Sequence, residues 1–98
     1  MAETIEELTI QYEEDDLILT KELDKEVLTK GLWTTIIFRY KLWSRKDEQY
    51  GPDKYTIRRY QKQGGYYRPK SKFNISSVKQ AKQIIDVLSD WVEEAEKQ

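Results

Sequence analysis

Basic and aromatic side chains alternate with apolar ones along residues 32–45, and these two residue types together can bind a nucleic acid. Trp33, Arg39, Lys41 and Trp43 occupy odd positions of this stretch. Successive side chains of a strand point to opposite faces of a sheet, so all four are expected on one face. Cations neutralise phosphates, and flat aromatic rings stack on unpaired bases. We therefore expect this face to bind a single-stranded nucleic acid.

The same two residue types recur in the next two predicted strands, residues 54–61 and 66–75. Gly64 and Gly65 mark the turn between these strands. We expect one sheet face to gather the cations and rings of all three strands, with Arg45 and Tyr66 beside them. The predicted nucleic-acid-binding residues are Trp33, Arg39, Lys41, Trp43, Arg58, Tyr60, Arg68, Lys70 and Lys72.

Charge is divided unevenly along the chain, although the net charge is only −1. Residues 1–28 contain ten acids and two lysines, whereas residues 30–72 contain twelve bases and three acids. A basic middle segment between acidic ends creates an uneven electrostatic field, which bears on the partners that the protein binds more than on its fold.

The composition argues against an enzyme, a metal site, a cofactor or a membrane partner. The chain has no histidine and no cysteine, which removes the most common acid–base groups and zinc ligands. No run approaches the roughly 18 apolar residues that a membrane helix needs, and the acidic N-terminus does not resemble a secretory signal. We expect an intracellular protein, in the cytoplasm or nucleoid of a prokaryote or the nucleus of a eukaryote.

Residues 1–16 are expected to form an acidic N-terminal arm, with a short strand at residues 8–12 and an extended, solvated run at residues 13–16. The arm is either a frayed end or a cover that lies on the basic face and competes with nucleic acid. Residues 17–98 form a single domain. It is expected to begin with a strand over residues 17–28 that breaks near Asp24, although the spacing of Leu19, Leu23 and Val27 also suits a helical turn. Pro69 places the strand 66–75 at a sheet edge or at a bulge.

After residue 76 the apolar period changes from two to three or four, which predicts an amphipathic helix of about twenty residues. Ser77 followed by Gln80 makes a capping box at its start. The fold class is therefore α+β, a curved antiparallel sheet of four or five strands followed by one long C-terminal helix. Such a helix is longer than this sheet needs, so we expect a homodimer. The predicted dimer contacts are Ile85, Leu88, Trp91 and Val92.

The run YTIRRYQKQGGYYRPKSKFNIS (residues 55–76), followed directly by the helix, resembles the positive cofactor four family of transcriptional coactivators. In that family an apolar-x-Ile-Arg-x-Tyr strand precedes a glycine turn and a basic segment that contains proline. The resemblance implies a curved sheet, a dimer joined through the helices and a preference for single-stranded DNA. It also implies that Arg58 contacts the phosphate backbone and that Arg68 and Lys72 belong to a basic hairpin arm.

The expected function is therefore binding of single-stranded DNA with little sequence selectivity, in the manner of a transcription cofactor that contacts the transcription machinery. Two alternatives stay open. One is an RNA-binding domain, because 2′-hydroxyl recognition depends on the placement of individual side chains. The other is a protein-interaction module that uses the aromatic sheet face and the helix.

Overall fold

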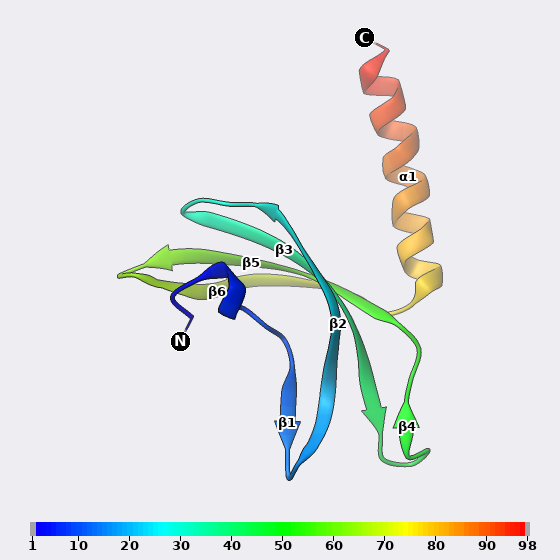
Figure 1. The fold of residues 1–98 in the computed structure, drawn as a ribbon. Helices are drawn as coiled ribbons and strands as arrows, with labels where there is room; N and C mark the ends of the chain where they lie inside the picture. The colour runs from blue at the N-terminus through cyan, green and yellow to red at the C-terminus, as the bar shows by residue number, and fades with distance from the viewer. Residues whose placement is uncertain (1, 98) are drawn as a thin grey trace.

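The chain forms a curled antiparallel half-barrel sheet from which one helix projects (Figure 1). The computed structural model describes residues 2–97. A single 3-10 turn, η1 (Ile5–Glu7), precedes the sheet. The remaining elements are β1 (Tyr12–Glu14), β2 (Leu17–Thr29), β3 (Trp33–Ser44), β4 (Gln49–Tyr50), β5 (Lys54–Gln63), β6 (Tyr66–Ile75) and α1 (Val78–Glu96). The predicted α+β class, a sheet followed by one C-terminal helix, is confirmed.

The strands follow the order β1-β2-β3-β5-β6, and the two-residue strand β4 pairs with the end of β3. Every pairing is antiparallel. The strand β6 lies at one edge of this order, as Pro69 predicted.

The pairing of β3 with β5 defines the two faces of the sheet. Ile36 lies opposite Arg58, and Phe38 lies opposite Thr56. Directly paired residues point to the same side. We call the side of Ile36 and Phe38 the arm face, and the side of Ile37 and Ile57 the helix face.

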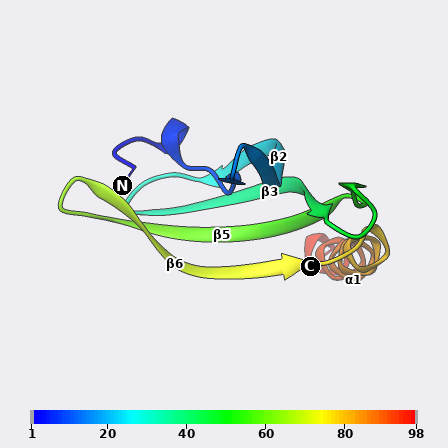
Figure 2. The same ribbon diagram turned by 90° about the horizontal axis from the view of Figure 1, so that it is seen from below.

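The hydrophobic core lies on the arm face, under the N-terminal segment rather than under the helix. Ile36 and Phe38 are fully buried, and they cluster with Tyr60 and with Leu8 of the N-terminal segment. Figure 2 shows this segment lying over the sheet, far from α1. The N-terminal segment, and not α1, therefore closes the core.

Only half of the acidic run at residues 13–16 is extended: Glu13 and Glu14 end β1, whereas Asp15 and Asp16 form a tight turn. Asp15 and Asp16 have φ values of 51° and 64°, a conformation that aspartate tolerates better than most residues. The turn joins β1 to β2, so the first strand is Tyr12–Glu14 instead of the predicted residues 8–12. The predicted break near Asp24 is absent: β2 continues through this residue, with a register shift between Glu22 and Asp24.

Another register shift lies between β5 and β6, at the proline that predicted it. Tyr60 pairs with Pro69 and Arg59 pairs with Ser71, which leaves Lys70 as an extra residue. A bulge of this kind changes which positions point to each face. Tyr67 therefore lies on the arm face, whereas Phe73 and Ile75 lie on the helix face.

The helix α1 begins at the predicted cap. The Ser77 hydroxyl accepts a hydrogen bond from the backbone N–H of Gln80 at 3.0 Å, and the Gln80 side chain accepts one from the Ser76 N–H at 2.7 Å. Over the described residues, α1 has no buried side chain. Its first half and the helix face, at Ile37, Ile57 and Ile75, line an apolar groove of about 480 Å³.

Candidate nucleic-acid interface

The predicted binding residues do not share one face, and that part of the prediction is wrong. Arg58, Tyr60 and Lys72 point to the arm face, because they belong to the register of Ile36 and Phe38. Lys70 is the extra residue of the bulge. The remaining predicted residues lie on the helix face, together with Tyr66: Trp33, Arg39, Lys41, Trp43 and Arg68.

Tyr60 is part of the core and is not an exposed stacking ring. Only 5% of it is exposed, and its neighbours in the core cluster are Leu8, Ile36 and Phe38. Burial raises the pKa of Tyr60 above its usual value of 10.0, an effect that Glu22 reinforces and the nearby Arg58 opposes. A base can reach this ring only if the N-terminal segment moves away.

The end of β3 near β4 is held together by its own side chains. The Lys41 ammonium lies 3.6 Å from an Asp53 carboxylate oxygen, and the Arg39 guanidinium lies 4.0 Å from the other oxygen. Trp43 packs edge-on against Tyr50 with ring centroids 5.0 Å apart. The Tyr50 hydroxyl in turn donates to the Ile18 carbonyl at 2.8 Å. These contacts pair the cations with an acid and engage the indole in packing within the protein.

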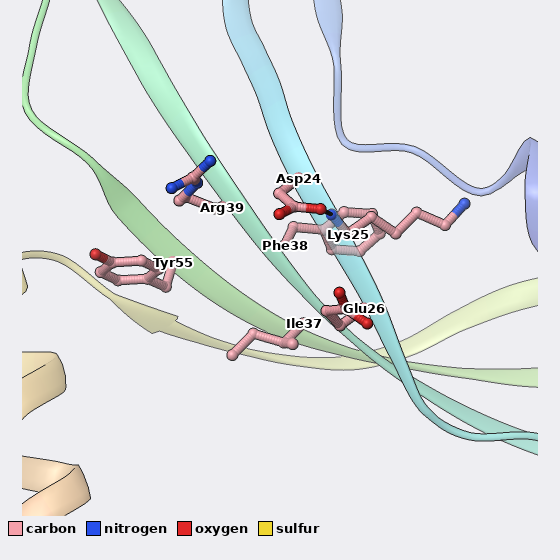
Figure 3. A pocket seen from close by; sticks show the side chains of 7 residues that line it. All are labelled: Asp24, Lys25, Glu26, Ile37, Phe38, Arg39 and Tyr55. Carbon is pink, nitrogen blue, oxygen red and sulfur yellow. Dashed lines mark hydrogen bonds between the residues drawn. The ribbon is translucent and has the colours of Figure 1, made fainter.

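A pocket of about 170 Å³ beside Arg39 has mixed charge (Figure 3). Asp24 and Glu26 contribute carboxylates to it, with Ile37 and Tyr55 at its wall. The figure also shows the Lys25 side chain extending away from Arg39, toward the N-terminal segment. Carboxylates repel phosphate, so this pocket does not suit a nucleic-acid backbone.

The opposite end of the helix face carries a preformed pair of a cation and an aromatic ring. The Arg59 guanidinium lies over the Trp33 ring, 4.6 Å from its centroid, and 41% of Trp33 is exposed. Gln61 lies opposite Trp33, and Arg68 lies opposite Gln61, so they continue the same surface. We call Trp33, Arg59, Tyr66 and Arg68 the hairpin-end site.

Arg59 is a residue that the sequence prediction missed. Alternation along β5 places Arg59 on the same face as Tyr55 and Ile57, and the sequence suggested that this face is apolar. The missing information was the register, because only pairing of Arg59 with Thr35 brings it to the side of Trp33.

The hairpin formed by β5 and β6 is strongly basic. Residues 54–75 contain seven lysines and arginines and no acid. Within residues 2–97, none of these seven lies in an ion pair, in contrast to Arg39 and Lys41. Arg58 is instead oriented by donating its Nε–H to the Thr56 hydroxyl at 3.1 Å. Half of the fourteen lysines and arginines that lie outside ion pairs in residues 2–97 therefore belong to this hairpin, where no acid accompanies them.

The described part of the chain contains no cluster of three or more acidic side chains arranged to hold a metal ion. None of its helices has the length and apolar character needed to cross a membrane. No family model, curated protein or solved structure matches the sequence or the fold.

Proposed function

We propose that the protein binds single-stranded DNA with little sequence selectivity through the hairpin-end site. The observation that carries the proposal is the Arg59–Trp33 pair, an exposed ring fixed beside unpaired cations. Stacking on such a ring contributes roughly 1–3 kcal/mol per base and is tolerant of sequence, because every base has a flat face.

The chemistry of the hairpin supports a backbone contact next to the ring. Its cations release counterions when they neutralise phosphates, which favours binding at low salt. Bases in a duplex are stacked on each other and leave Trp33 nothing to stack on. The resemblance of residues 55–76 to the positive cofactor four family supports the same ligand and a role as a transcription cofactor.

We also propose that the protein acts as a homodimer. The predicted contacts Ile85, Leu88, Trp91 and Val92 are 60%, 51%, 64% and 51% exposed in one protomer. A second copy can bury this stripe together with the apolar groove at Ile37 and Ile57. Ile37 is four strand residues from Trp33, roughly 13 Å, so a partner seated there leaves the hairpin-end site open.

Titration of tryptophan fluorescence with oligo-dT, an RNA homopolymer and duplex DNA at two salt concentrations tests the proposed function. We expect oligo-dT to quench strongly, duplex DNA to quench weakly, and affinity to fall steeply as salt rises. RNA that quenches better than oligo-dT would assign the site to RNA. Equal and negligible quenching by all three ligands would overturn the proposal in favour of a protein-interaction module.

A matched pair of arginine variants locates the site. We expect Arg59→Gln to weaken oligo-dT binding by about tenfold or more, since it removes both a cation and the support of the Trp33 ring. Arg39→Gln is the control on the same face, and its effect should be smaller because Asp53 already offsets its charge. The opposite order of effects would move the site to the other end of β3.

A further inference from the structure

The N-terminal segment, residues 2–10, crosses the arm face and is tied to the basic hairpin itself. The carbonyl of Ala2 accepts a hydrogen bond from the Tyr67 N–H at 2.9 Å, and the two residues form an antiparallel bridge. Tyr67 lies between Tyr66 and Arg68 of the hairpin-end site. The side chains of Tyr66 and Arg68 point to the helix face and that of Tyr67 to the arm face, so the segment is tied to the same strand from the opposite side of the sheet.

A backbone bridge, side-chain hydrogen bonds and apolar packing hold this segment on the sheet. The Lys25 ammonium donates to the carbonyls of Ile5 and Leu8 at 2.8 and 2.7 Å. Leu8 is the only side chain among residues 2–10 that is buried, at 6% exposure. Ala2, Ile5 and Ile10 pack half-buried against the same core cluster, and the Thr9 hydroxyl donates to a Glu22 carboxylate at 2.6 Å. All these contacts lie within one short terminal segment, so they can be lost together by local opening.

Beneath the segment lie groups that suit a nucleic acid. Arg58, Tyr60, Tyr67 and Pro69 line a hollow of about 310 Å³ whose other wall is the N-terminal segment. Lys72, directly opposite Arg58 on β6, adds a cation on the same face. A cation beside a tyrosine ring is the same combination that the hairpin-end site offers.

The segment also carries negative charge, as a competitor for a nucleic-acid site should. It carries Glu3, Glu6 and Glu7 and no base. Among residues 2–97, these carboxylates form no ion pair with the hairpin cations. Their attraction to the hairpin is therefore indirect and can be replaced by phosphates that contact the cations directly.

We propose that residues 2–10 are an intramolecular competitor, which leaves the arm face when single-stranded DNA extends from the hairpin-end site onto Arg58, Tyr60 and Lys72. This inference rests on the proposed function and adds its regulation. The apparent affinity for DNA that covers both faces is then the affinity of the open form multiplied by the fraction of molecules whose segment is open.

A reversible lock tests the inference. The chain has no cysteine, so the double variant Ala2→Cys/Tyr67→Cys contains one defined pair of cysteines. Bridged antiparallel residues lie about 4.5–5.5 Å apart at Cα, which suits a disulfide. We expect the oxidised form to bind fluorescein-labelled oligo-dT about tenfold more weakly than the same protein after reduction, as measured by fluorescence anisotropy.

The single variant Tyr67→Cys, oxidised and reduced in the same way, is the control. Its affinity for oligo-dT should be the same in both redox states. Circular dichroism of both redox states should show the same folded sheet. Equal affinity of the locked and the reduced double variant would overturn the competitor and leave the proposed function standing. Failure of the unmodified protein to bind oligo-dT at low salt would overturn both.

Discussion

At the scale of single residues, two adjacent arginines have opposite surroundings. Arg58 lies on the arm face and donates to Thr56, whereas Arg59 lies on the helix face over Trp33. Arg59 is exposed, whereas Arg58 is half-buried beside the N-terminal segment. In the proposed complex, the two would present positive charge to a nucleic acid from different sides of the sheet.

The raised pKa of Tyr60 predicts a loss of stability in alkali. The unfolded chain ionises this phenol near pH 10, while the buried phenol keeps its proton to a higher pH. Its contribution to the free energy of unfolding is thus complete below about pH 10 and falls as the pH rises from there through the folded-state pKa. Urea unfolding at about pH 8 and about pH 11 should show a larger loss for the natural protein than for Tyr60→Phe. An identical loss of unfolding free energy in both proteins would mean that the pKa of Tyr60 is not raised by folding.

At the scale of elements, local signals predicted the hairpin and the helix well. The strand over residues 66–75 and the start of α1 agree with the structure, because a glycine pair and a serine cap act within a few residues. The candidate site was less predictable. The face of the sheet to which each of its residues points depends on the register of β3 against β5 and on the extra residue at Lys70. Docking of Leu8 on the arm face is also non-local and has no sequence pattern.

The capping of α1 can be tested because the helix packs little against its own sheet. Ser77→Ala removes the hydroxyl that accepts from the Gln80 N–H, and caps of this type contribute about 1 kcal/mol. We expect faster amide hydrogen exchange in the first turn of α1. Ser76→Ala is the matched control, since Ser76 contributes its backbone N–H, which alanine retains. Equal exchange in the two variants would mean that the cap does not stabilise the helix.

At the scale of the whole molecule, the protomer is a thin layer with extents of 54 × 40 × 17 Å. One face of its sheet is covered by the nine residues of the acidic N-terminal segment, and the other meets the first half of an amphipathic helix. A layer of this kind buries little apolar surface by itself, which limits its stability. Association of two helix faces would correct this deficit without using the hairpin.

A matched pair of glutamate variants tests that association. Leu88→Glu places a charge in the middle of the exposed apolar stripe, and Gln83→Glu adds the same charge at a polar position of the same helix. Burying an unpaired carboxylate is costly, so we expect Leu88→Glu to be monomeric where the natural protein and Gln83→Glu are dimers. Sedimentation velocity at about 10–100 μM measures this difference. A natural protein that sediments as a monomer across this range would contradict the dimer, while binding of short oligo-dT by Leu88→Glu would show that the hairpin-end site works within one protomer.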